Sequence, residues 1–171
     1  MARPLLPALL MSLALGAPPA AAQQWRPYQP DGGSYRVDFP GQPVEDVHEV
    51  ATNIGPIRTR TSSITIGDKI FMTIISRYPG HVTMGDPQKN LDDVRDSSVR
   101  KVNGSLRKEE RLEVSDEPAR HLLIDLPRDT LADALLVLDG HRLLQAIYVG
   151  PRQIEEPPEA RRFLGSFTLL R

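Results

Sequence analysis

The chain has 171 residues, with 21 basic and 22 acidic side chains, a formal net charge of −1 and no cysteine. This balance of charge argues against binding to nucleic acid or to an anionic membrane, which require a basic face. The lack of cysteine excludes disulfides, thiolate metal sites and thiol catalysis, and the length suits one domain of ordinary size.

The first 22 residues have the pattern of a secretory signal peptide. Arg3 supplies a positive start, residues 5–15 form a short apolar core, and Ala20-Ala21-Ala22 offers the small residues that a signal peptidase needs. A membrane-spanning helix needs about 20 apolar residues, which this segment lacks, and no cysteine follows it for lipid attachment. We therefore expect cleavage near Ala22 and a periplasmic or secreted product. An uncleaved leader that acts as an anchor is the alternative.

A polar lead-in segment follows over residues 23–33, and a single α+β domain is predicted over residues 34–171. The lead-in contains proline and glycine, and Trp25 and Tyr28 interrupt its polar sequence. We expect these two aromatic side chains to hold the segment against the domain; stacking on a ligand is the alternative.

Before the first helix, strands are predicted over residues 34–39, 44–51, 57–66 and 70–78. Residues 70–75 are apolar on both faces. We therefore expect the fourth strand to lie centrally and to be covered on both sides. On the third strand Arg58 and Arg60 share a face, where they either pair with acids on the neighbouring strand or hold an anion.

Asp86 and Pro87 predict the start of a helix, because aspartate caps a first turn and proline fits within it. Gly104 predicts its end. On the outer surface Asp96 and Arg100 have the i,i+4 spacing of a favourable ion pair. The apolar face is expected to consist of Leu91, Val94, Val99 and Val102.

Further strands are predicted over residues 106–114, 119–126 and 141–149. Residues 130–138 are ambiguous: Thr130 and Asp133 match a helix capping box, whereas Asp139-Gly140 is typical of a hairpin turn between strands. We predict a strand over residues 132–138.

The last helix is predicted to begin at Pro157 and Pro158, with Glu155, Glu156 and Glu159 at its positive end. Its apolar face, expected to pack on the sheet, consists of Ala160, Phe163, Leu164 and Phe167. Because the strands are joined by short turns, the predicted fold class is α+β, with an antiparallel sheet flanked by helices.

Three stretches together resemble small exported bacterial domains of the PsbP-like kind, which include DcrB-like periplasmic proteins. They are GGSYRVDFPGQP at Gly32–Pro43, LVLDGHRLLQAIYVG at Leu136–Gly150 and ARRFLGSFTLL at Ala160–Leu170. The resemblance implies an antiparallel sheet sandwiched by helices, and a binding or accessory role rather than an enzymatic one. Because the matched positions are turn and core residues, it assigns no functional residue.

The histidines offer little support for catalysis or metal binding. His48, His81, His121 and His141 show neither i,i+3 nor i,i+4 spacing, and no zinc-binding motif is present. His48 and His121 lie on predicted strands and could meet Glu49 or Asp125. The simpler interpretation is a solvated or hydrogen-bonded histidine on each strand.

Two pairs of carboxylates are also present, Asp92 with Asp93 and Asp125 with Asp129. Neighbouring side chains diverge by about 100° around a helix, so Asp92 and Asp93 do not share a proton. A solvated helix face is the expected role of that pair.

These observations predict an exported, non-enzymatic accessory or interaction module, monomeric or weakly associating, that binds an envelope protein or complex. No residue is assigned to catalysis, a cofactor or a metal, and the binding residues are unknown. Such a module should expose an apolar patch. One alternative is a small-ligand carrier or sensor, with a pocket of roughly 300–1,000 Å³ between sheet and helix. Another is a hydrolase, in which His48 or His121 meets an acid and a nucleophile.

Overall fold

The computed structural model describes residues 24–152 and 157–170. The predicted signal peptide lies outside these residues and stays a prediction. Glu155 and Glu156 also lie outside them, so their expected interaction with the helix dipole stays a prediction. The described chain forms, in order, β1 (Arg26–Tyr28), β2 (Tyr35–Phe39), β3 (Val44–Thr52), β4 (Gly55–Ile66), β5 (Lys69–Arg77), α1 (Pro87–Lys101), β6 (Ser105–Val114), β7 (Glu117–Leu126), β8 (Thr130–Asp139), β9 (Arg142–Pro151), α2 (Pro158–Gly165) and β10 (Thr168–Leu169).

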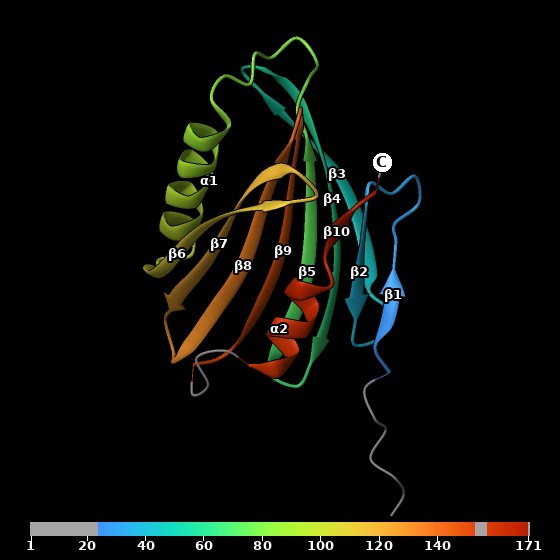
Figure 1. Cartoon of the computed structure of the whole chain (residues 1–171), viewed down its shortest axis with the longest axis vertical. Coiled ribbons are helices and arrows are strands. Elements are labelled where there is room, and N and C mark those ends of the chain that lie inside the picture. The colour runs from blue at the N-terminus through green and yellow to red at the C-terminus, as the bar shows by residue number, and fades with distance from the viewer. Residues whose placement is uncertain (1–23, 153–156, 171) are drawn as a thin grey trace, which may run out of the picture.

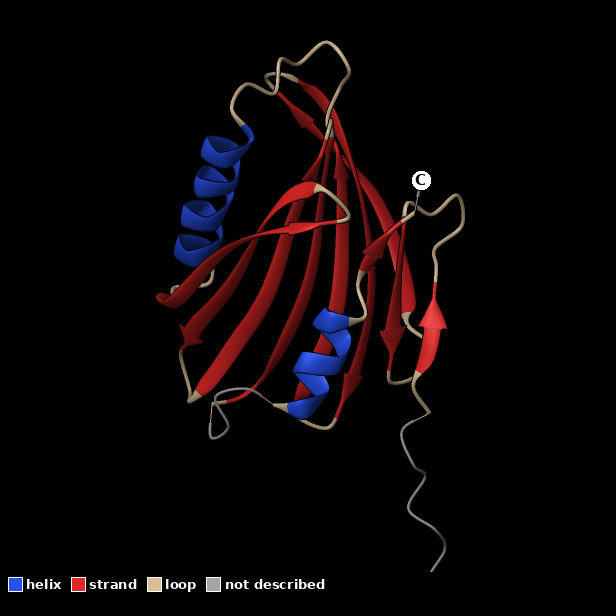
Figure 2. Ribbon diagram, in the orientation of Figure 1, coloured by secondary structure: helices blue, strands red, loops and turns tan. Residues whose placement is uncertain are grey.

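The strands form two antiparallel sheets, which confirms the predicted α+β class (Figure 1). The large sheet has the order β3-β4-β5-β9-β8-β7-β6, and a small sheet has the order β1-β2-β10. The two helices lie against different parts of the large sheet (Figure 2). The strands β1 and β10, which the sequence did not indicate, pair with opposite edges of β2 and so join the two ends of the described chain.

One side of the large sheet, here called the aromatic face, packs against β2 and α2. Phe71 of β5 meets the rings of Phe163 and Tyr148 edge-on, with centroids 5.5 and 5.3 Å away. Trp25 lies 5.6 Å from the same ring, and Tyr28 is buried against Phe39. The expectation that these two aromatic residues hold the lead-in segment against the domain is therefore confirmed.

On the opposite side, here called the α1 face, α1 begins as predicted. The Oδ1 atom of Asp86 accepts a hydrogen bond from the Gln88 amide at 2.8 Å, and Pro87 occupies the first turn. Leu91 is fully buried, but Val102 is 44% exposed. Val102 was expected on the apolar face. It is the C-cap, one residue past the end of α1, with φ −91° and ψ 2°.

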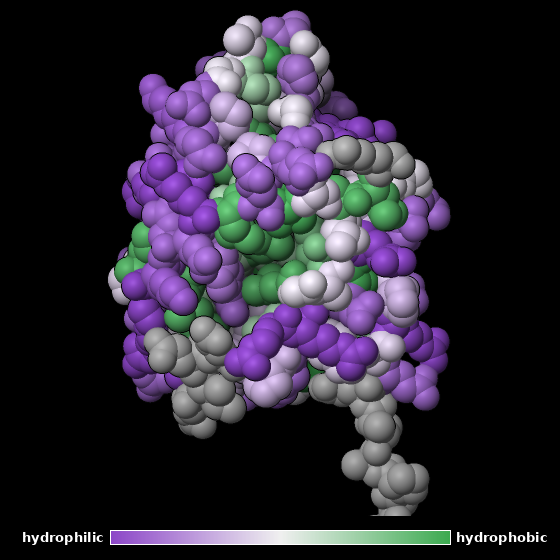
Figure 3. All heavy atoms as spheres, in the orientation of Figure 1, coloured by the Kyte–Doolittle hydropathy of each residue, from purple (hydrophilic) through white to green (hydrophobic). Residues whose placement is uncertain are grey.

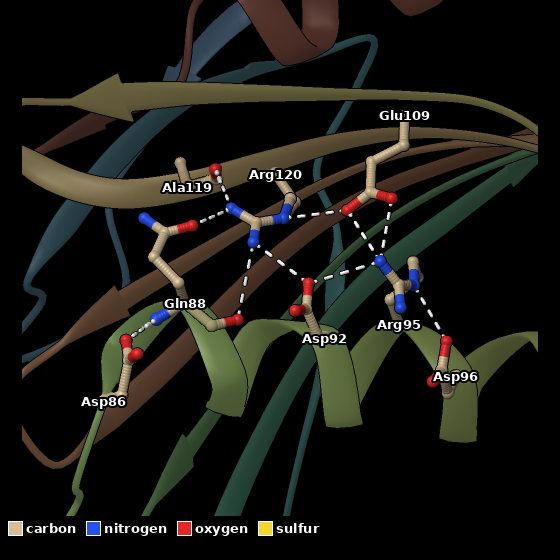
Figure 4. Close-up of polar contacts among 8 residues, drawn as sticks. All are labelled: Asp86, Gln88, Asp92, Arg95, Asp96, Glu109, Ala119 and Arg120. Carbon is tan, nitrogen blue, oxygen red and sulfur yellow. Dashed lines mark hydrogen bonds and ion pairs between the residues drawn. The ribbon is translucent and has the colours of Figure 1, made fainter.

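A fully buried guanidinium, that of Arg120 on β7, holds α1 to the sheet (Figure 4). It donates to Glu109 of β6 at 2.8 Å and to Asp92 of α1 at 3.0 Å, and it also contacts Gln88. Arg95 donates to the same Glu109 at 2.8 Å. A buried charge needs such partners, because an unpaired one is costly to desolvate.

Two sequence predictions about the outside of α1 are only partly correct for this reason. Asp93 is solvent-exposed as expected, but Asp92 accepts hydrogen bonds from Arg120 and Arg95. Asp96 forms its ion pair with Arg95 at 2.8 Å, while the positive charge of Arg100 also lowers the pKa of Asp96. In both cases Arg95 is drawn into the cluster around Arg120, which sequence spacing along α1 does not indicate.

The strand covered on both sides is β8 and not β5. Residues 131–138 are buried without interruption, between the aromatic core and α1. This confirms the predicted strand and explains its helix-like apolar run, which is typical of a strand buried on both faces. In β5, by contrast, Phe71, Thr73 and Ile75 are buried while the alternate residues are half-buried or exposed, so the prediction of two-sided cover was wrong.

Replacing Arg120 by alanine is expected to lower the free energy of unfolding by about 3 kcal/mol. This loss of stability lies at the low end of the range for breaking a buried ion pair, because Asp92 and Glu109 keep Arg95 as a partner. Urea unfolding followed by circular dichroism measures it. The matched control is Arg36→Ala, which removes an exposed arginine of β2 and should change stability by less than about 0.5 kcal/mol. Equal effects of the two substitutions would contradict the structural role of Arg120.

Candidate functional site

A groove of about 520 Å³ lies between α2 and the β6–β7 hairpin, on the aromatic face. Figure 3 shows hydrophobic side chains gathered at the centre of this side of the molecule. The apolar lining comes from Leu112, Val114, Leu135, Leu164 and Phe167. Charged residues of both signs also line it, including Lys108, Glu110 and Arg161, so the groove combines an apolar lining with polar groups, as ligand pockets do.

Local structure fixes both walls of the groove. Ser115 and Asp116 have positive φ values of 52° and 68°, which allows a tight turn between β6 and β7. The Leu169 amide of β10 donates to Ser115 Oγ at 3.3 Å and links the hairpin to the end of the chain. The wall formed by α2 is held by the burial of Phe163 and by an ion pair between Lys69 and Glu159.

His121 of β7 and Asp133 of β8 form a hydrogen-bonded pair in the lining of the groove. The Nε2 atom of His121 lies 2.5 Å from Asp133 Oδ1, and Asp133 is buried. The hydrogen bond to Asp133 raises the pKa of His121 above its usual value, against the lowering effect of burial. Within residues 24–152 and 157–170, no hydroxyl group is hydrogen-bonded to His121, so the pair has the acid partner of a catalytic triad but not its nucleophile.

The structure does not bring the other candidate residues to this groove. His48 lies 3.3 Å from Asp46 on the edge strand β3, far across the sheet order from His121. The alternative contacts with Glu49 and Asp125 are not formed, and the simpler interpretation, a hydrogen-bonded histidine on each strand, is confirmed. His141 contacts the carbonyl of Val82 at 2.9 Å, and His81 is exposed in a loop.

The second acidic pair is held by arginines. Asp125 binds Arg107, and Arg152 lies 2.6 Å from Asp129 and 3.8 Å from Asp125, so it bridges the two carboxylates. In the described part of the chain no cluster of histidine and carboxylate side chains is suited to a metal ion. No helix there is long and apolar enough to cross a membrane.

A second candidate surface, here called the open face, lies on the α1 face beside the helix. It consists of alternate residues of β4, β5 and β9, whose neighbours in sequence point to the aromatic core. The cluster beneath α1 draws residues from β7, β8 and β9 but none from β4 or β5. The open face is formed by Thr59, Thr61, Ser63, Thr65, Ile70, Met72, Ile74, Ser76 and Gln145. Ile147 and Val149 of β9 border it and pack against the cluster beneath α1.

None of these residues carries a charge. Ile70 is 36% exposed, and the surface continues onto β3, where Val44 is 75% exposed opposite Ser63. Asp46 and His48 bound it on that strand. The sequence of residues 70–75 shows this apolar pattern, but the pattern alone predicts burial within the domain rather than an open surface.

Comparisons with known proteins bear on the fold. No protein-family model and no curated protein matches the chain. Among solved structures, it is similar to the solution structure of cyanobacterial PsbP from Synechocystis sp., with 15% sequence identity and a TM-score of 0.59 over 91% of this chain and 99% of that chain. A protein of unknown function from Pseudomonas aeruginosa has 10% identity and a TM-score of 0.36, over 80% of this chain and 85% of that chain. The first similarity shows a PsbP-like fold, and the second is too distant to add to it.

The His121–Asp133 pair predicts a specific dependence of stability on pH. Because the pKa of His121 is raised on folding, the stabilisation is fully present below the pKa of the unfolded state, about 6.5, and is lost as pH rises through the folded pKa. NMR titration of the His121 ring should give a pKa above that value, and unfolding by urea should become easier across the same interval. Asp133→Asn should abolish both effects; an unchanged titration in that variant would contradict the assignment.

Proposed function

Because the chain folds as a PsbP-like domain, we propose that it is a non-enzymatic accessory module that binds a partner protein of the bacterial envelope through the open face. The observation that carries this proposal is an uncharged sheet surface that the chain's own helices leave uncovered. The predicted signal peptide at residues 1–22 supports an exported location. The polar pair Asp46–His48 would then lie at the rim of the interface.

The cost of removing charged groups from water favours an uncharged surface as a protein interface. An interface core is depleted in charged residues, because each charge removed from water needs a partner. Sheet surfaces that face solvent usually alternate with polar and charged side chains. In the open face Ile70, Met72 and Ile74 take those positions, flanked by hydroxyl groups of β4. A partner that fits presents apolar and hydroxyl-bearing side chains and no unpaired charge at its centre.

A second function is favoured by the groove at α2. Its volume of about 520 Å³ and its apolar lining suit a small ligand. The His121–Asp133 pair would supply the polar contact that orients such a ligand. The groove and the open face lie on opposite faces of the large sheet, so the two functions can be tested independently.

The interaction proposal predicts that one new charge on the open face prevents complex formation. The full chain, captured with its partner from its own host under mild cross-linking, should lose that complex at least tenfold in Ile70→Glu and in Ser63→Glu, because burying an unpaired carboxylate costs several kcal/mol. Ser63→Glu keeps every apolar residue and so isolates the effect of charge.

The matched control is Val47→Glu, an exposed position of β3 on the aromatic face, 43% exposed, which should leave the complex intact. Binding should then be reconstituted with the identified partner alone. Equal recovery from all variants would contradict the proposal, and loss of a self-associated species instead would identify a second copy of the chain as the partner.

The groove predicts binding of an apolar fluorescent probe. Leu112→Asp should weaken that binding about tenfold, the effect of losing one apolar contact of roughly 1.5 kcal/mol, whereas Ile70→Glu should not change it. Native mass spectrometry of the purified full chain would show a ligand that co-purifies. Equal probe binding by Leu112→Asp would place the probe elsewhere and remove support for the carrier function.

A further inference from the structure

A third surface, here called the arginine pocket, lies where the β1–β2 connection passes over the ends of β4 and β5. It has a volume of about 300 Å³. Arg58 and Arg60 of β4 and Arg77 of β5 line it, together with Ser34 and Asp31 of the connection. It is separate from both the open face and the groove, the two surfaces to which the proposed functions are assigned.

Two of the three arginines that line the arginine pocket form no ion pair among the described residues. Arg60 forms the cross-strand ion pair that the sequence suggested, with Glu45 at 3.0 Å. Arg58 instead lies directly opposite Arg77 in the register of β4 and β5. Across the described residues, neither has a carboxylate within ion-pair distance. Like charges placed directly opposite each other on a sheet are destabilising, so this pairing is unfavourable in the isolated domain.

Other charged groups around Arg58 and Arg77 do not form ion pairs that would neutralise these two positive charges. Glu49 lies opposite Arg58 on β3 but forms no ion pair with it. On the other side of Arg77, Arg142 of β9 pairs with Asp139. Asp31 lines the pocket without an ion pair to either arginine. Two positive charges are therefore left facing the space beneath the connection.

Ser34 supplies an independent indication of a ligand. Ser34 is only 4% exposed, and its Oγ atom is a buried polar atom with no hydrogen-bond partner in the described structure. Its carbonyl oxygen accepts from the Leu170 amide at 2.8 Å, which fixes the backbone. An unsatisfied buried hydroxyl costs free energy, and the residue that carries this one lines the same pocket as the two arginines.

We propose that the arginine pocket binds the phosphate group of a small phosphorylated compound or of a phospholipid headgroup. Guanidinium groups match phosphate oxygens with paired donors. A phosphate monoester carries a charge of about −1.5 to −2 at neutral pH, which balances Arg58 and Arg77. The Ser34 hydroxyl donates to a remaining oxygen. The volume lies at the lower end of the range for small-molecule sites.

Isothermal titration calorimetry of the full chain at low salt tests the proposal, with glycerol phosphate as the probe and succinate as the carboxylate comparison. Arg58→Gln and Arg77→Gln are each expected to weaken binding of glycerol phosphate roughly tenfold or more, and Ser34→Ala severalfold. Asp31→Asn should strengthen it, since it removes a negative charge from the pocket. The control Arg36→Gln makes the same change of net charge outside the pocket and should have no effect.

A second readout separates a binding site from a structural one. Because Arg58 and Arg77 repel each other, Arg58→Gln should leave the thermal midpoint of unfolding unchanged or raise it, while phosphate binding is lost. A lowered midpoint with unchanged binding would overturn the proposal.

Vesicles distinguish the two sources of the phosphate group. Flotation with vesicles containing phosphatidic acid, but not with phosphatidylcholine alone, would assign a lipid headgroup, and binding of glycerol phosphate without flotation would assign a soluble compound. Either result supports the site, provided Arg77→Gln abolishes it. The proposal would be overturned if neither flotation nor binding of glycerol phosphate at millimolar concentration were observed. Tighter binding of succinate than of glycerol phosphate, as expected of a site for an acidic peptide, would also overturn it.

Discussion

The buried guanidinium of Arg120 is the interaction on which the arrangement of this molecule depends. A charge with no exposure to solvent must be surrounded by acceptors, and Arg120 finds them on α1 and on β6. These contacts fix α1 over β7 and β8, because Arg120 would lose its acceptors if the helix shifted along the sheet. The rest of the α1 face, over β4 and β5, is consequently left without a cover.

The aromatic face is organised differently, by apolar packing rather than by a charge. Rings from the lead-in segment, β2, β5, β9 and α2 meet edge-on around Phe71. Because α2 is short and anchored near β5 through Lys69 and Glu159, it leaves the β6–β7 hairpin standing away from it. The groove is the space between these two elements. The groove and the open face therefore both follow from how far one helix extends over the sheet.

The candidate surfaces were predictable only in part. The apolar residues on both faces of β5 were plain in the sequence, but periodicity cannot say whether the domain itself covers both faces. Arg58 and Arg60 were recognised as a possible anion site. The two-residue turn at Gly67-Asp68 fixes the register of β4 with β5, so the pairing of Arg58 with Arg77 follows from local sequence once that turn is accepted. No local sequence pattern indicated the partners of His121 and Arg120, since these partners come from neighbouring strands and from a helix.

The sequence by itself determined the features that depend on near neighbours and on periodicity. The alternation in β2, the cap at Asp86 and the prolines before α2 each act within a few residues, and each produced the predicted element. Only the tertiary structure decided that β8 rather than β5 is buried on both faces and that Arg120 is enclosed. The physical reason is that burial and charge pairing depend on which distant segments pack together, and that choice is made by the sheet and its helices as a whole.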